Sequence, residues 1–223
     1  QAINGTFKTY KDTDFSNDKR IKNLRSSLNF LQKSFNKLIT SNDSSGFKRL
    51  SKVEIRRLVF LVGQLLEKYN LQKFEDVFAK EFVLIYRKRE ELLQKKEEIE
   101  ESGGDIPADL STQCAEWQEY KDFTRSDSVA GQKHIHNILF KYFLIQIPDL
   151  EEKDTEKRFF NEHEREAIFL RAGGKCENPN CAISMNYDDF EADHVVPYAN
   201  GGKTNLSNAK ALCRDCNRKK SDN

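Results

Sequence analysis

Four of the five cysteines lie in two close pairs near the end of the chain. Cys176 and Cys181 are separated by the four residues ENPN, and Cys213 and Cys216 are separated by two. Both spacings let a tight turn bring two thiolates onto one tetrahedral ion. Two such pairs with no vacant position indicate a closed, structural zinc site, which could supply much of the folding free energy of a small domain. The alternative is that these cysteines are ordinary buried or adventitious thiols. That alternative could account for one isolated pair, but it accounts poorly for two pairs that flank one compact segment.

The use of cysteine also bears on the cellular compartment. Grouped pairs with Cys114 left over favour metal binding in a reducing compartment over a disulfide framework. No stretch approaches the roughly 20 consecutive apolar residues that a membrane helix needs, and no charged-then-apolar leader opens the chain. We therefore expect a cytoplasmic protein without a membrane partner.

The composition is that of a globular protein whose helices carry charged outer faces. Charged residues make up 33% of the chain, and it contains 16 Phe. The formal net charge is only +1, so a nucleic acid would have to be held by a local basic patch. The sequence opens on Gln1 and its only methionine is Met185, which indicates a fragment or processed product and leaves room for a preceding domain or a partner subunit.

Apolar residues recur at steps of three and four through the first 150 residues, which predicts a mainly α-helical domain. A first helix is predicted from the stripe Ile21, Leu24, Leu28, Leu31, Phe35 and Leu38. A loop is expected from Asn42 to Gly46. Ser51 and Glu54 then fit a capping box for a second helix that reaches Tyr69.

Three further helices are predicted in the same region. One begins near Lys73 and runs into a charged, solvated end, and a loop rich in Gly, Pro and Asp follows over 102–111. A short helix contains Trp117, and a longer one is ended by Pro148. His134 and His136 on that last helix are two positions apart, so they point to different faces and are poor joint metal ligands.

A charged linker, DLEEKDTEK, separates a helical domain at residues 1–150 from a second domain at 158–223. Asn161 and Glu164 mark the expected start of a helix in the second domain, and Gly173 and Gly174 its end. The segment FEADHVVP then alternates as a short strand, with Phe190, Ala192 and His194 on one face. Two glycines allow a loop, NAKALC can return as a second strand, and CRDCNRKK begins a helix. The predicted arrangement is β-β-α, held at its base by zinc.

This ordered pattern resembles the zinc-containing branch of the HNH endonucleases, also called ββα-metal nucleases. The resemblance covers about 161–223 and rests on the following residues: Cys176, Cys181, Asp193, His194, Gly201, Gly202, Asn208, Leu212, Cys213, Cys216, Asn217 and the basic residues 218–220. It implies hydrolysis of a DNA phosphodiester, with a structural Zn²⁺ and a catalytic Mg²⁺ or Mn²⁺.

The resemblance also assigns roles to single residues. His194 would be the general base, a role suited to a neutral histidine near its working pKa. Asp193 and Asn217 would be the Mg²⁺ or Mn²⁺ ligands, and carboxylate and amide oxygens suit such hard ions. Asn208, five positions before Cys213, would hold the loop and orient the histidine ring, with Asn205 as the second choice.

Each of these residues also has a simpler interpretation. The Asp-His step could merely hydrogen-bond at the end of a strand, and Asn217 could merely cap the last helix. Asp215 stays open between assisting the metal and lying in solvent. The basic residues of the last helix would contact DNA phosphates, or else form only a soluble surface: Arg214, Arg218, Lys219 and Lys220.

The segment FKRLSKVEIRRLVFLVGQLL, which starts at Phe47, is similar in hydrophobic pattern to the helical part of bacterial restriction and antiphage proteins that join a ParB-like domain to an HNH nuclease. The hallmark ParB-like motifs are absent. The expected function is therefore a metal-dependent DNA endonuclease in bacterial defence or restriction. The rivals are a catalytically inactive zinc-stabilised module that binds DNA or protein, and a nuclease that acts on RNA.

Overall fold

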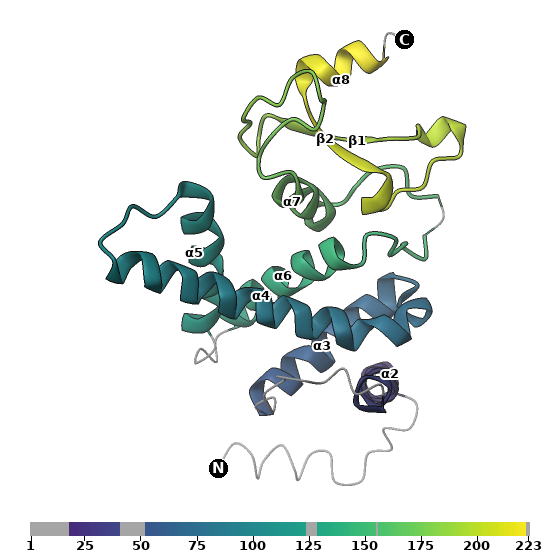
Figure 1. Ribbon diagram of the computed structural model, residues 1–223. Helices are drawn as coiled ribbons and strands as arrows, with labels where there is room; N and C mark the ends of the chain where they lie inside the picture. The colour runs from purple at the N-terminus through teal and green to yellow at the C-terminus, as the bar shows by residue number, and fades with distance from the viewer. Residues whose placement is uncertain (1–17, 41–51, 124–128, 155, 222–223) are drawn as a thin grey trace.

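The computed structural model describes residues 18–40, 52–123, 129–154 and 156–221. The protein is mainly helical, as predicted (Figure 1). Its first part contains α2 (Lys19–Thr40), α3 (Lys52–Lys68), η1 (Leu71–Phe74), α4 (Glu75–Glu101), α5 (Ala108–Phe123) and α6 (Val129–Gln146). Its last part contains α7 (Glu162–Arg171), β1 (Phe190–His194), η2 (Tyr198–Asn200), η3 (Leu206–Asn208), β2 (Ala209–Cys213) and α8 (Arg214–Ser221). No helix in the described ranges is long and apolar enough to span a lipid bilayer.

Aromatic rings form much of the core between the helices. Phe78 of α4 stacks on Phe143 of α6 at a centroid distance of 4.6 Å and meets Phe30 of α2 edge-on at 5.1 Å. Trp117 of α5 stacks on Tyr142 at 4.4 Å. Offset-stacked and edge-on pairs are the favoured geometries for aromatic rings. The high phenylalanine content of the sequence thus serves the packing of α2, α4, α5 and α6.

Helix α2 forms where predicted, but it buries a face that differs in part from the predicted one. Leu24 and Leu28 are 44% and 46% exposed, whereas Ser27 and Phe30 are buried. A Cβ added to Gly63 of α3 would lie 3.1 Å from the Ser27 hydroxyl. The two helices therefore approach closely at Ser27 and Gly63. Leu31 and Leu38 of the predicted stripe are buried, and Ser27, Phe30 and Ser34 are buried beside them in place of Leu24 and Leu28.

Several predicted boundaries are shifted. The loop expected over 102–111 is shorter, because α5 already begins at Ala108, directly after Pro107. Helix α5 is also longer than predicted, and α6 ends two residues before Pro148. The Asn42–Gly46 loop and Ser51 of the predicted capping box lie outside the described residues.

The charged segment after α6 is bound to the end of α3. Asn70 donates its backbone N–H to the carbonyl of Glu151 at 2.9 Å, and Lys153 donates its own to Lys68 at 2.8 Å. One buried apolar cluster extends from Phe143 of α6 to Ile168 of α7. The two halves of the chain therefore meet across a packed junction, while their division into domains at 1–150 and 158–223 remains a prediction.

Helix α7 is capped as the sequence indicates. Asn161 accepts a hydrogen bond from the backbone N–H of Glu164, whose carboxylate accepts one from the N–H of Asn161. Gly174, just past the end of the helix, has a φ of +66°. Arg171 donates to the carbonyls of Leu206 and Ala209 at 2.5 and 2.6 Å, which holds α7 against the hairpin.

Strands β1 and β2 pair antiparallel, with His194 opposite Ala209 and Phe190 opposite Cys213. Helix α8 follows β2 without a break and packs on both strands (Figure 1). The β-β-α order predicted from the sequence is therefore confirmed.

Candidate metal centre and active site

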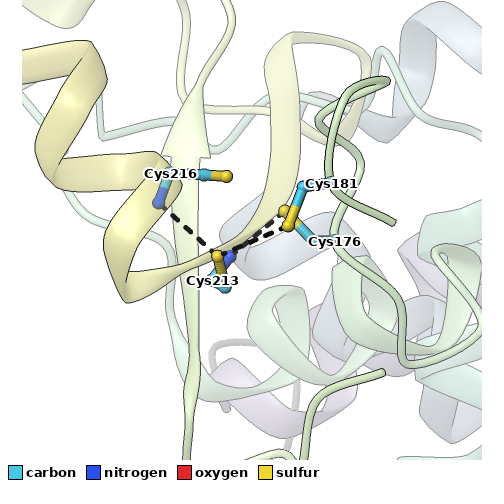
Figure 2. Close-up of side chains that lie close together, drawn as sticks. All are labelled: Cys176, Cys181, Cys213 and Cys216. Atoms are coloured by element: carbon cyan, nitrogen blue, oxygen red, sulfur yellow. Dashed lines mark hydrogen bonds between the residues drawn. The ribbon is translucent and has the colours of Figure 1, made fainter. Parts of the chain in front are cut away.

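The four paired cysteines converge at the base of the hairpin (Figure 2). All four sulfur atoms lie within 4.8 Å of one another, and Cys181 Sγ is 4.0 Å from Cys213 Sγ. Thiolates at about 2.3 Å from a tetrahedral ion are about 3.8 Å apart, so the observed spacing fits one such ion. The donor set is all sulfur, which suits zinc. These residues could therefore hold a structural metal, as the sequence predicted.

Several N–H groups point at these sulfur atoms. Cys213 donates its backbone N–H to Cys176 Sγ at 3.4 Å, and Cys216 donates its own to Cys213 Sγ at 3.5 Å. Asn178 donates its side-chain amide to Cys216 Sγ at 3.1 Å. The N–H of Cys216 is the main cause that lowers the pKa of the Cys213 thiol. Donors of this kind favour the thiolate form that binds a metal.

The loop between the strands is held closed by Asn208. Its Oδ1 accepts from the backbone N–H of Val196 at 2.8 Å, and its Nδ2 donates to the carbonyls of Val196 and Lys203 at 3.0 and 2.8 Å. These bonds join the two ends of the loop, while the role of Asn208 in the site stays a prediction. Asn205, the second choice, is buried and caps η3 by accepting from the N–H of Asn208.

The two adjacent glycines of this loop meet different requirements. Gly201 has a φ of +83°, which favours glycine because it has no Cβ. Gly202 is buried, and a Cβ added to it would lie 1.8 Å from the carbonyl oxygen of Val196 and 2.9 Å from Nδ2 of Asn208. The second glycine therefore permits the close approach on which the Asn208 clamp depends.

The ring of His194 is fixed by Thr204. The Thr204 hydroxyl donates to the backbone carbonyl of Lys157 at 2.9 Å, and Nε2 of His194 lies 3.0 Å from the same hydroxyl oxygen. A hydroxyl has one hydrogen to donate, so Thr204 must accept from His194, and Nε2 carries the proton. In the neutral ring, Nδ1 is then the atom with a lone pair available to accept a proton.

The surroundings of His194 also keep it neutral. Phe160 stacks on the ring at a centroid distance of 4.6 Å. Burial is the main cause that lowers the pKa of His194 below its usual value, and the positive charges of Lys220 and Arg158 act in the same direction against the opposing effect of Asp193. A neutral imidazole at pH 7 is what a general base requires.

The carbonyl that accepts from Thr204 belongs to Lys157, which is part of a largely buried polar cluster between the two parts of the chain. Lys157 Nζ lies 2.5 Å from Glu164 and 3.0 Å from Glu152. Asn161 donates to Glu152 and to the hydroxyl of Tyr69 at the end of α3. Glu164 is only 1% exposed, and its burial raises its pKa. Hydrogen bonds and ion pairs therefore link the His194 ring, through Thr204 and Lys157, to the helical part of the chain.

Asp193 and Asn217 both lie between β1 and α8. Asp193 accepts from the Lys220 ammonium, which also donates to the carbonyl of His194. Asn217 donates its Nδ2 to Glu191, so Oδ1 is the atom of Asn217 that could ligate a hard cation. Glu191 and Asp193 are two positions apart and share one face of the strand. Three oxygen-bearing side chains thus lie along this face of the hairpin.

Asp193 and His194 open into one cavity of about 310 Å³. Its other lining residues come from the segment before α7, from α7 and β1 themselves, and from the loop after β1: Arg158, Phe159, Phe160, Arg165, Ala192, Pro197, Tyr198 and Ala199. The structure thus brings the predicted base and one predicted metal ligand together, while Asn217 lies outside the lining of this cavity, on α8.

The basic residues of α8 do not form one uniform surface. Arg214 is 3.6 Å from Asp189 and donates to the carbonyl of Asp188. Arg218 and Lys219 are exposed. Lys220 instead turns toward Asp193. All four predicted phosphate-binding residues are exposed, but Arg214 and Lys220 are each paired with an acidic side chain of the same region.

Comparison with protein families assigns the C-terminal part of the chain to a family. Residues 176–223 match the family model described as HNH endonuclease. The C-terminal region is an HNH domain. Comparison of the chain with the curated proteins and with solved structures finds no match in either. The match begins at Cys176 and contains both strands and α8, so the HNH domain includes the cysteine cluster, the clamp of Asn208 and the cavity face of β1.

Three residues that contact the predicted site residues had no role in the sequence analysis. Thr204 and Phe160 contact the ring of His194, and Glu191 accepts a hydrogen bond from Asn217. The strand alternation already placed Glu191 on the face of Asp193, so that signal was present in the sequence. Phe160 and Lys157 precede the matched region and approach His194 only through the fold.

Proposed function

We propose that this chain is a metal-dependent DNA endonuclease that hydrolyses phosphodiester bonds through its HNH site. The observation that carries this proposal is the hydrogen bonding of the His194 ring, which determines which ring nitrogen carries the proton. The Thr204 hydrogen bond occupies Nε2, so Nδ1 is the acceptor, and the ring lines the same cavity as Asp193. A neutral imidazole beside a carboxylate in an open cavity supports proton abstraction from a bound nucleophile.

The chemistry requires a water that attacks phosphorus in line with the departing 3′ oxygen. His194 would accept the proton of that water at Nδ1 while Thr204 keeps the ring in place. Stacking on Phe160 prevents the ring from turning out of the cavity. The expected products are a 5′-phosphate and a 3′-hydroxyl.

The side chains between β1 and α8 fit a hard divalent cation. A carboxylate from Asp193 and an amide oxygen from Asn217 are suitable ligands for Mg²⁺ or Mn²⁺. The Lys220 ammonium on Asp193 supports the view that this position attracts positive charge. When bound, such an ion would polarise the phosphate and stabilise charge on the departing oxygen.

We further propose that the substrate is DNA, held in part by the exposed Arg218 and Lys219 through its phosphates. Cysteines that bind zinc must be reduced, which supports a cytoplasmic location. A role in bacterial restriction or antiphage defence rests on the sequence resemblance of the helical segment alone.

The test is cleavage of supercoiled plasmid with Mg²⁺ or Mn²⁺ by the chain and by its His194→Ala variant. Loss of a general base is expected to reduce the rate by about 10²- to 10⁴-fold. His134→Ala is the matched control, because His134 contacts Glu119 on the helical part and should leave the rate unchanged. Zinc content is measured in all three proteins.

Each alternative gives a different result in this experiment. DNA binding without cleavage, unaffected by divalent ions or by His194→Ala, would favour an inactive zinc-stabilised module. Faster cleavage of single-stranded RNA than of DNA would make the chain a ribonuclease. Equal cleavage by the His194→Ala variant would exclude His194 as the base.

A further inference from the structure

Two adjacent phenylalanines before α7 have opposite environments. Phe160 is 8% exposed and stacks on the His194 ring. Phe159 is 75% exposed, more than any other large hydrophobic side chain in the described ranges. Phe159 therefore has no role in packing the core. Its ring is open to solvent in the lining of the cavity that also contains His194.

Phe159 is not isolated from charge. The guanidinium of Arg158 lies over its ring, 5.4 Å from the centroid. A cation placed over a ring face is attracted by the ring quadrupole, so this contact restricts how the exposed ring can turn. Arg158 and Phe159 therefore present a positive charge and an aromatic ring together.

Both residues line the cavity that contains Asp193 and His194. The lining of this cavity also includes Pro197, Tyr198 and Ala199. A phosphodiester backbone is anionic and complements Arg158, but it does not complement these apolar surfaces. The faces of nucleobases do complement them, because every base has a π-face that stacks on aromatic side chains.

We propose that Phe159 is a stacking platform for a nucleobase next to the cleaved phosphate, with Arg158 binding a neighbouring phosphate. This inference rests on the proposed nuclease function, because it takes the cavity to be the place of cleavage. A base inside an intact duplex has both faces covered by its neighbours. The favoured substrate is therefore DNA with a single-stranded or locally unstacked nucleotide at the cleavage position.

The experiment measures binding separately from cleavage. The chain and its variants are titrated, with Ca²⁺ in place of Mg²⁺, into a fluorescent single-stranded oligodeoxynucleotide and into the same strand fully paired. Phe159→Ala should weaken single-strand binding roughly 5- to 100-fold, the range expected for loss of one stacked base. Phe159→Trp should retain binding. Phe60→Ala removes another exposed aromatic ring, 58% accessible on α3, and should change nothing.

A second readout reports on the base itself. A 2-aminopurine placed beside the cleavage position changes its fluorescence when it leaves its neighbours and stacks on an aromatic side chain. The change should occur with the parent chain and with Phe159→Trp, and should be lost with Phe159→Ala.

The outcomes separate this inference from the proposed function. Unchanged single-strand binding by Phe159→Ala overturns the stacking platform, even if His194→Ala abolishes cleavage. If that unchanged binding is accompanied by a fall in oligomeric state, Phe159 belongs to a protein interface instead. Conversely, lost binding in a chain that cleaves nothing supports the platform and refutes the nuclease.

Discussion

The ammonium group of Lys220 hydrogen-bonds the carboxylate of Asp193. Lys220 lies on α8 and Asp193 on β1, so this contact joins the helix to the hairpin across the candidate metal site. Lys220 also donates to the carbonyl of His194, which follows Asp193 in the strand. A residue expected to bind DNA phosphate is thus directed at a residue expected to bind metal.

We predict that Lys220→Ala tightens Mn²⁺ binding, because the ammonium and a divalent ion compete for the same carboxylate. Both side chains are partly exposed, so the gain should be modest, about two- to fivefold in the dissociation constant. Electron paramagnetic resonance of free Mn²⁺ measures it without reference to cleavage. Lys219→Ala changes the net charge equally and should leave Mn²⁺ affinity almost unchanged. Weaker Mn²⁺ binding by Lys220→Ala would exclude competition.

We predict that Thr204→Val lowers the maximal cleavage rate roughly 10- to 100-fold with little change in KM, as expected when a reacting group is misplaced. Valine retains the shape of threonine but cannot accept from Nε2 of His194, so the ring loses its fixed tautomer. Thr204→Ser keeps the hydroxyl and should restore most of the rate. Nitrogen NMR of the His194 ring shows the tautomer directly, and an unchanged tautomer in Thr204→Val would remove Thr204 from this role.

The pH dependence of cleavage provides an independent check on His194. Burial lowers the pKa of this histidine below the 6.5 that is usual for the residue, so the neutral base is the main form at pH 7. The rate should rise with pH through a midpoint below 6.5 and then stay level to neutral pH. A midpoint above 6.5 would mean that the protonated form is stabilised, contrary to this environment.

The C-terminal elements could be predicted from sequence because their motif residues have local causes. Cysteine spacing fixes the tight turns, Asn161 and Glu164 cap each other within one helical turn, and the glycines permit backbone that other residues resist. Residues 190–194 alternate as a strand must. These signals act over short distances along the chain, and the structure reproduces them.

Features that depend on distant packing could not be predicted in this way. The buried face of α2 is set by the close approach of Gly63 to Ser27, which the apolar pattern of α2 alone does not contain. The partner of His194 is Thr204, ten residues away, and its orientation depends on the carbonyl of Lys157. Only the folded chain shows which hydroxyl reaches which ring.

We predict that Cys213→Ser loses zinc and unfolds the hairpin, because a four-cysteine site supplies on the order of 10 kcal/mol of folding free energy to a small domain. Cys114→Ser is the matched control. Cys114 is buried on α5 and donates to the carbonyl of Leu92 at 3.3 Å, a bond that serine can keep. Zinc per chain and thermal unfolding are measured for both variants. Retention of stoichiometric zinc by Cys213→Ser would contradict the metal centre.

The adjacent glycines of the loop allow a sharper test of what holds the active site together. Gly202→Ala should destabilise the protein by about 3 kcal/mol, since the new methyl group would overlap the carbonyl of Val196 and displace the amide of Asn208. Gly201→Ala meets open space and carries only the cost of a positive φ, about 1 kcal/mol. Urea unfolding gives the two free energies.

Cleavage by the same two variants separates the effect of backbone strain at Gly201 from the effect of losing the Asn208 hydrogen bonds. In Gly202→Ala, Asn208 should lose its hydrogen bonds to the backbone of Val196, which lies two residues after His194. The loop that carries Thr204 should then move, and the cleavage rate should fall by more than the loss of folded protein explains. Gly201→Ala leaves the Asn208 contacts intact and should cleave normally at a temperature where it is folded. If Gly201→Ala proves the more damaging change in both assays, the close approach at Gly202 is not what closes the loop, and backbone conformation at Gly201 controls the site instead.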